Sequence, residues 1–197
     1  MSRPRSILEK DAIERALILF WDKGYNRTSI ADLGEAIGVG PSSIYNAFGS
    51  KQELFEKAMA QYMGTHADFV GQLFAKSGGM STTHFVGELL SKLVKLYTDK
   101  TTPPGCAMMQ AGGSGAASDS QACAVTLKMK TSLESSLYEF FKAKTANCEE
   151  LSAPPKILAK FIVGTIRGLS QLACDGSSRK ELLAVADHAA TSCSQSD

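Results

Sequence analysis

The sequence predicts an all-α protein built from two domains. Apolar residues recur at spacings of three and four along most of the chain, which is the period of a helix with one buried face. β-branched residues do not alternate with polar residues over any useful length, so strands are not expected. Glycines and short polar residues interrupt the pattern where helices would begin or end. We expect a small domain over residues 1–60 and a larger helical domain over residues 61–197.

The first expected helix spans about residues 10–23 and has an apolar stripe on one face. Asp11 in its first turn and Lys23 in its last turn suit the helix dipole, and Gly24 follows as the stop. The stripe consists of Ile13, Ala16, Leu17 and Phe20.

Two short helices joined by a tight turn are expected next. Thr28 or Ser29 can cap the first of them, and Ser29 with Asp32 fits a capping box. Residues 38–40, Gly-Val-Gly, form the turn. Pro41 suits the first position of the following helix, because its fixed φ is already helical and its missing N–H is not needed there.

A fourth helix is expected to lead out of the first domain. Ser50 with Glu53 fits a second capping box at its start. Its buried residues are expected to be Leu54, Phe55, Ala58, Met59 and Tyr62.

Longer helices follow in the second domain. One broad apolar stripe covers residues 85–97. Residues 101–119 can hold at most a turn or two of helix after Pro104, because their glycines are costly in a helix interior. Ser118 or Asp119 can cap the next helix. The stripe of that helix is Met129, Leu133, Leu137, Phe140 and Phe141.

The last two helices are expected at about residues 156–173 and 178–192, followed by a frayed tail. The first of them is apolar on nearly every side, which is typical of a buried helix. Together they carry more apolar surface than one small domain can cover. This favours packing against a second copy of the chain, with Ile166 and Leu169 in the contact. The alternative is an internal core helix.

The second and third helices have the form of a helix-turn-helix. The third is too short and too polar on its outer side to be a plain core helix, and its side chains can reach base edges or phosphates. No acidic residue occurs between Glu35 and Glu53, which removes repulsion toward a phosphate backbone, although the whole chain carries a formal charge of only +1. The alternative is a three-helix bundle with a polar surface. The exposed polar residues are Ser42, Ser43, Tyr45 and Asn46.

The segment from Ile13 to Phe55 contains an ordered set of further marks. These are Phe20, Gly24-Tyr25, Thr28-Ser29, Ile37-Gly38-Val39, Ile44-Tyr45, Phe48, Ser50-Lys51 and Glu53-Leu54. With them, the segment resembles the N-terminal domain of the TetR/AcrR family of transcriptional regulators. The resemblance implies a homodimer whose two third helices enter successive major grooves of a palindromic operator in double-stranded DNA. It also implies a small-molecule effector bound in the C-terminal domain.

DNA contacts, mostly to phosphate, are implied by the same resemblance. The residues that match the family's contacts are Thr28, Ser43, Tyr45, Asn46 and Lys51. Ser29 and Ser42 are added as neighbouring candidates. Arg3 and Arg5, before the first helix, could reach a minor groove or the backbone as an arm, or form a solvated, disordered start.

The five cysteines are odd in number and include no C-x-x-C pair, so we expect reduced thiols and neither a disulfide framework nor a zinc site. Cys106 lies in the segment expected to be flexible, where its thiol could react with an electrophile or remain an inert apolar group. With Met108 and Met109 it would suit Cu(I), but no histidine or second cysteine is near in sequence, and no metal is expected.

An effector pocket is expected among the middle helices, because DNA uses the first domain and the partner subunit uses the last two helices. Its lining should combine aromatic and sulfur side chains with few polar groups. The candidates are Tyr97, Cys106, Met109, Met129, Tyr138, Phe141, Phe161 and Arg167. Cys106 is then part of the wall or a reactive trigger, and Arg167 could clamp an acidic effector or pair with a neighbouring carboxylate.

Competing classes of function have less support in the sequence. An enzyme is not expected, because there is no Gly-rich phosphate loop after a strand and no G-x-S-x-G motif, and no cofactor is implied. A constitutive architectural DNA-binding protein would be far more basic.

No apolar run approaches the roughly 18 residues of a membrane span, and the start lacks the apolar stretch of a signal peptide. We therefore expect a cytoplasmic, ligand-responsive repressor without a membrane partner.

Overall fold

The computed structural model describes residues 5–111 and 120–194, and within these ranges the chain is helical. The β-type contact in this part of the chain is an isolated bridge between Leu151 and Ser194. The prediction of an all-α fold is confirmed. Contacts divide the chain into two compact units. The first unit contains the residues up to Asp68 together with Ala107–Lys128, and the second contains Phe69–Cys106 together with Met129–Asp197.

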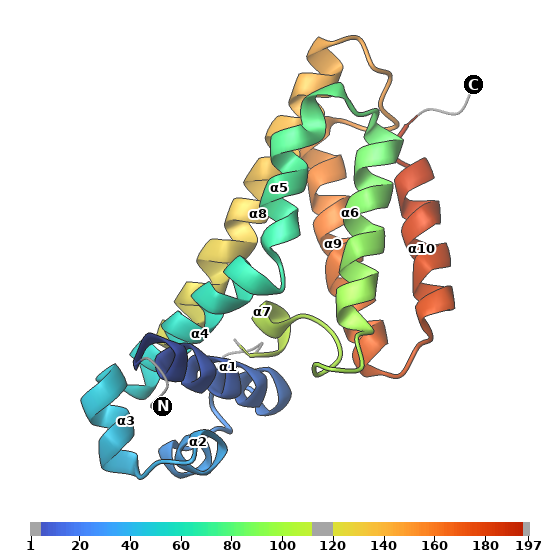
Figure 1. The fold of residues 1–197 in the computed structure, drawn as a ribbon. Helices are drawn as coiled ribbons and strands as arrows, with labels where there is room; N and C mark the ends of the chain where they lie inside the picture. Colours follow the sequence, from blue (N-terminus) through green and yellow to red (C-terminus); the bar gives the residue numbers. More distant parts are fainter. Residues whose placement is uncertain (1–4, 112–119, 195–197) are drawn as a thin grey trace. The chain divides into compact units, whose positions relative to one another are not determined.

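The first unit is built on α1 and α4, with α2 and α3 beside them (Figure 1). Its helices are α1 (Arg5–Lys23), α2 (Ile30–Ile37), α3 (Pro41–Phe48), α4 (Lys51–Thr65), α7 (Ala107–Gln110) and the first part of α8 (Ser120–Ala146). Two edge-to-face ring pairs join α1 to α4. Phe20 meets Phe55 with 5.1 Å between ring centroids, and Trp21 meets Tyr62 at 5.2 Å.

Helix α1 begins at Arg5, earlier than the predicted start near Lys10. The extra turn of helix is accompanied by a tertiary contact, because Glu9 accepts a hydrogen bond from Lys57 of α4 at 3.2 Å. Sequence periodicity identifies the buried stripe of a helix but does not show where polar residues find a partner on another helix.

The first unit also extends beyond the predicted boundary at residue 60. His66, after the end of α4, contacts Glu14 of α1 with 2.9 Å between Nε2 and Oε1. From the middle of the chain, Ala111 accepts the Tyr25 N–H at 2.9 Å. Both contacts join residues that are far apart in sequence, so no local signal could reveal them.

The second unit places α6, α9 and α10 side by side (Figure 1). Its elements are α5 (Asp68–Lys76), the 3₁₀ turn η1 (Ser77–Gly79), α6 (Thr82–Tyr97), the later part of α8, α9 (Pro155–Cys174) and α10 (Arg179–Thr191). The predicted stripe over residues 85–97 is confirmed, since its apolar side chains are buried. α10 lies close to Gly87 of α6, where an added methyl group would make an ordinary contact with the Ala190 Cβ at 3.6 Å.

A polar network joins the start of α6 to the end of α8. The Thr82 N–H donates to a Glu149 carboxylate oxygen at 2.6 Å. Lys144, which is buried, donates to the Met80 carbonyl and lies 3.9 Å from Glu149. A buried ammonium group requires such partners, so this network fixes the loop between η1 and α6.

Residues 192–194, which follow α10, are held in place, contrary to the predicted fraying, and the rest of the predicted frayed tail lies outside the described residues. The Ser152 N–H donates to the Cys193 carbonyl at 3.1 Å, and Ser194 forms the bridge to Leu151. Cys193 is fully buried, and burial raises the pKa of its thiol to about 11. A buried side chain and a backbone pairing together outweigh the usual disorder of a terminus.

Helix α9 is less enclosed than its composition predicts. One side, including Ile162 and Ile166, is buried, whereas Ile157, Phe161 and Leu172 are exposed on the other side. The helix also has the length and mean hydropathy of a membrane span, which a count of consecutive apolar residues did not detect. Its buried side packs on α6 and α10.

Helix ends follow the sequence signals closely. Ser29 and Asp32 form the predicted capping box. Ser50 accepts the Glu53 N–H at 3.1 Å, but Glu53 accepts from the Ser50 hydroxyl at 2.9 Å, which makes a modified form of the predicted box. The short helix after Pro104 is confirmed as α7. The predicted caps Ser118 and Asp119 lie outside the described residues.

Gly105→Ala should destabilise the second unit. Gly105 has φ of 79°, and a methyl group there would lie 2.6 Å from Cys174 Sγ and 2.9 Å from the Ser170 carbonyl oxygen. We expect a loss of about 2 kcal/mol in the free energy of unfolding, measured as a lower melting temperature by circular dichroism. Gly71→Ala in α5 is the control, because nothing lies within 4 Å of its added methyl group. Equal melting temperatures of the two variants would contradict this account.

Candidate nucleic-acid interface

A tight glycine turn sets α3 against α2. Gly38 has φ of 85°, and its N–H donates to the Gly34 carbonyl at 2.9 Å. The turn passes so close over α2 that a methyl group at Gly34 would lie 2.7 Å from the Val39 carbonyl oxygen. Gly34 is therefore a second glycine that this helix-turn-helix needs, although its position inside a helix gave no signal in the sequence.

Helix α3 has a buried side and an exposed polar side. Ile44 and Phe48 are buried in the core of the first unit. The outer side presents the four predicted polar residues, all exposed, and the Tyr45 side chain is 51% exposed. These residues are Ser42, Ser43, Tyr45 and Asn46. Short hydroxyl and amide groups on an exposed helix suit hydrogen bonding to base edges and phosphate oxygens.

The start of α2 is stabilised by a network around Asp32. Its carboxylate accepts the Ser29 N–H at 2.8 Å and the Lys23 ammonium at 3.0 Å. Hydrogen bonds from Ser29, and then the Lys23 contact, hold the pKa of Asp32 well below its usual range. A lowered pKa in the folded state means that this stabilisation is present above the usual carboxyl pKa and is lost as the pH falls through the lower value.

Thr28 is in a different environment from the other candidate DNA contacts. Its side chain is 1% exposed, and its hydroxyl donates to the Gly24 carbonyl at 2.8 Å. Its N–H donates to the Tyr25 carbonyl at 3.2 Å. This burial argues against a DNA contact from the Thr28 side chain and gives it the role of closing the turn between α1 and α2.

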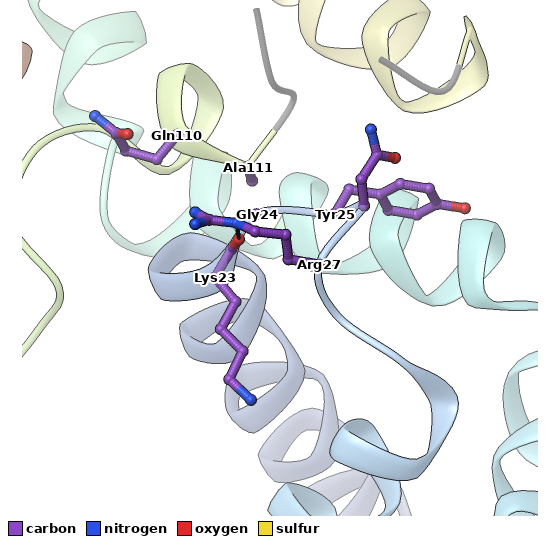
Figure 2. A pocket seen from close by; sticks show the side chains of 7 residues that line it. Lys23, Gly24, Tyr25, Arg27, Gln110 and Ala111 are labelled. Carbon is purple, nitrogen blue, oxygen red and sulfur yellow. Dashed lines mark hydrogen bonds between the residues drawn. The ribbon is translucent and has the colours of Figure 1, made fainter. Parts of the chain in front are cut away.

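Lys51 lies at the first position of α4, close to the same turn. Its Nζ lies 4.1 Å from the centre of the Tyr25 ring. Arg27, in the turn, donates from Nε to the Lys23 carbonyl at 2.7 Å (Figure 2). Residues 36–52 contain no acidic side chain, so no carboxylate of the turn or of α3 opposes positive charge near this face. The positions of Tyr25 and Arg27 were not predicted as part of the site.

The predicted effector residues separate into different groups. Tyr97 and Cys106 lie together in the second unit, where burial, and then the Cys106 thiol, raise the pKa of the Tyr97 hydroxyl well above its usual value. The Cys106 side chain is 2% exposed, and its N–H donates to Ser170 Oγ at 2.9 Å. Phe141 is also buried.

The remaining candidates do not join Tyr97 and Cys106 in one enclosed group. Met129 is partly exposed on α8, and Tyr138, Phe161 and Arg167 are exposed. Met109 belongs to α7 in the first unit. Helical spacing predicts that a residue lies on an apolar stripe, but it does not show which neighbour that stripe will meet.

An exposed polar helix, held by a glycine turn on a three-helix core, defines a helix-turn-helix DNA-binding protein. The family model described as "Bacterial regulatory proteins, tetR family" matches residues 12–58. The chain is 30% identical over 190 residues to the HTH-type transcriptional repressor ComR of Escherichia coli (strain K12), covering 93% of this chain and 88% of ComR. It is 27% identical over 187 residues to the repressor BdcR of the same strain, with the same shares covered. The chain belongs to the TetR family of bacterial regulatory proteins.

Solved structures of the same fold include two complexes with operator DNA. A cysteine mutant of the TetR family transcriptional regulator CifR, complexed with 26-bp double-strand operator DNA, has a TM-score of 0.85 and 30% identity, and the match covers 96% of this chain and 98% of CifR. A second cysteine mutant of CifR with operator DNA has a TM-score of 0.83 and 29% identity, with 98% of both chains covered. The protein is thus a DNA-binding transcriptional regulator and not an enzyme, and the predictions of family and fold are confirmed.

Proposed function

We propose that this protein represses transcription as a cytoplasmic homodimer that binds a palindromic operator and leaves it when a small-molecule effector binds the second unit. The observation that carries the proposal is the exposed polar side of α3, which lies in a stretch, residues 36–52, that contains no acidic residue. Relatives named as transcriptional repressors, matched over most of their length, support the direction of regulation.

The proposed docking gives the exposed residues different roles. Ser42, Ser43 and Asn46 are assigned to base edges, because they lie on the outer side of the helix that would enter the major groove. Tyr45 and Lys51 are assigned to phosphates, which fix position without reading sequence. Ser29 serves first as the cap of α2, and its contribution to DNA binding is through the placement of that helix end.

Lys51→Ala should weaken binding to every duplex, because a phosphate contact carries no sequence information. The probes are a duplex selected by the wild-type protein from a random library and a duplex of unrelated sequence. The slope of log affinity against log salt should become shallower by about 0.9 per subunit. Ser43→Ala should instead reduce the preference for the selected duplex and leave the slope unchanged. Fluorescence anisotropy across a salt series measures both, and unchanged binding of Lys51→Ala to both duplexes would refute the docking.

The proposed dimer contact uses the exposed side of α9 and α10. Ile157, Phe161 and Leu172 are exposed on α9, and Gly164 and Gly168 are spaced with them at three and four residues. A methyl group at either glycine would have no neighbour within 4 Å in the subunit, so a second helix could approach closely. Val185 on α10 is also exposed.

The partner-facing residues differ from those expected from the sequence. Ile166 and Leu169 are each 1% exposed inside the second unit, so they belong to its own core and cannot face a partner. The apolar stripe of α9 extends around most of the helix, and sequence alone does not show which part of it the subunit itself covers.

Phe161→Glu should convert the dimer to monomers. A carboxylate placed on a 43% exposed aromatic position would be buried without a partner in the dimer but solvated in the monomer. Sedimentation velocity at micromolar concentration measures the change. Leu127→Glu is the matched control, because Leu127 is 56% exposed but lies on the part of α8 in the first unit. A monomeric wild-type protein would rule out this contact.

The proposed effector site lies around Tyr97 and Cys106. The two side chains are buried together, and Cys106 is followed directly by α7 of the first unit. A ligand changes operator affinity only if it binds one arrangement of the protein better than another. The burial of the thiol favours a role in the wall of an apolar, reversible site over a role as a reactive trigger.

Among the four cysteines whose side chains the structure describes, N-ethylmaleimide should therefore react first at Cys148, which is exposed, without releasing the protein from the selected duplex. Intact-mass spectrometry counts the modified thiols, and anisotropy follows release in the same sample. Cys106→Ser should behave as the wild-type protein does, and Cys148→Ser should lose the early modification. If N-ethylmaleimide rapidly released the wild-type protein from the duplex but did not release Cys106→Ser, Cys106 would instead be identified as a reactive sensor.

A further inference from the structure

Tyr25 stands where three segments of the first unit meet. Its N–H donates to the Ala111 carbonyl at 2.9 Å, and its own carbonyl accepts the Thr28 N–H at 3.2 Å. Its ring lies edge-on to Phe55, with 5.0 Å between centroids, and 4.1 Å from the Lys51 Nζ. Tyr25 and Ala111 line a small pocket with a volume of about 190 Å³. Figure 2 shows these two residues with the rest of its lining. The residue is therefore fixed through both its backbone and its ring.

Lys51 occupies a position that helix electrostatics disfavour. It is the first residue of α4, where the positive end of the helix dipole repels an ammonium group. The face of an aromatic ring attracts an ammonium group, so the Tyr25 ring offsets part of this repulsion and restricts where the charge can lie. A cation that is already oriented loses less side-chain freedom when it binds an anion.

The backbone of Tyr25 is itself held by a segment from the middle of the chain. α7 packs against α1 and α4, and its last turn leads to Ala111, which is fully buried. The Ala111 carbonyl fixes the backbone of Tyr25 just after Gly24, whose φ of 81° turns the chain out of α1. Without this acceptor, the Tyr25 N–H would be left at a buried position with no partner from α1.

We propose that Tyr25 is a positioning residue for operator binding. Its ring holds the Lys51 ammonium where a DNA phosphate can meet it, and the Ala111 carbonyl holds the Tyr25 backbone that carries the ring. This inference rests on the proposed phosphate contact of Lys51. It assigns to Tyr25, which is buried, a contribution to DNA affinity that requires no contact with DNA.

A double-mutant cycle on the full-length protein tests the proposal, with the selected and unrelated duplexes as probes. Tyr25→Leu keeps an apolar side chain but removes the ring, and should weaken binding to both duplexes about five-fold. Tyr25→Phe keeps the ring and should bind within about two-fold of the wild-type protein. In a Lys51→Ala background, Tyr25→Leu should have no further effect, because no ammonium group remains to be positioned.

Two results would overturn the proposal: an equal loss from Tyr25→Leu in both backgrounds, or a loss from Tyr25→Phe as large as that from Tyr25→Leu. The affinity of the single variant Lys51→Ala reports on the phosphate contact, so a failure of the proposed docking can be distinguished from a failure of the role proposed for Tyr25. If Tyr25→Leu melts far below the wild-type protein, a variant with ring-fluorinated phenylalanine at position 25 is tested in place of Tyr25→Leu. Fluorine weakens the negative face of the ring and preserves the shape of the side chain. Affinity equal to that of Tyr25→Phe would then overturn the proposal.

Discussion

The packing of α1 against α4 is the constraint on which the DNA-facing surface depends. Edge-to-face pairs such as Phe20 with Phe55 and Trp21 with Tyr62 have a preferred angle as well as a preferred distance, so they fix how the two helices cross. The helix-turn-helix lies between these helices in the chain, and both its ends start from this frame. The exposed ion pair of Lys57 with Glu9 contributes little beside it, because water screens such charges.

This chain is nearly neutral, so its suitability for binding DNA depends on where its charges lie and not on its net charge. The carboxylate nearest the start of α2, Asp32, is directed into the helix cap, where Ser29 and Lys23 satisfy it. Its negative charge thereby stabilises the helix end and is partly compensated by Lys23. Residues 36–52, between Glu35 and Glu53, contain no carboxylate, and Lys51 adds a positive charge near the end of this stretch. A local arrangement of a few residues thus does what a strongly basic composition does in other DNA-binding proteins.

Local features of the fold could be predicted from the sequence, and long-range ones could not. Helix caps and glycine stops depend on residues three or four positions apart, so Ser29 and Gly38 identified their helix ends correctly. The boundary of the first unit depends on Ala111, and the held tail depends on Cys193, both paired with distant segments. The exposed side of α3 followed from its pattern. The burial of Thr28 and the separation of the effector candidates did not, because they depend on which surfaces meet.

The discontinuity of the first unit limits how the protein can be divided. A fragment that ended at Asp68 would contain every residue of the helix-turn-helix but would lack α7 and the Ala111 carbonyl. The buried faces of α1 and α4 that α7 covers would then be open to water, and the turn at Gly24 would lose its backbone anchor. The DNA-binding unit of this protein therefore cannot be obtained as an N-terminal fragment alone. A chimeric regulator that contains this DNA-binding unit must also include the short segment that follows Cys106. Transfer of the DNA specificity therefore also requires transfer of part of the sequence that connects the DNA-binding unit to the second unit.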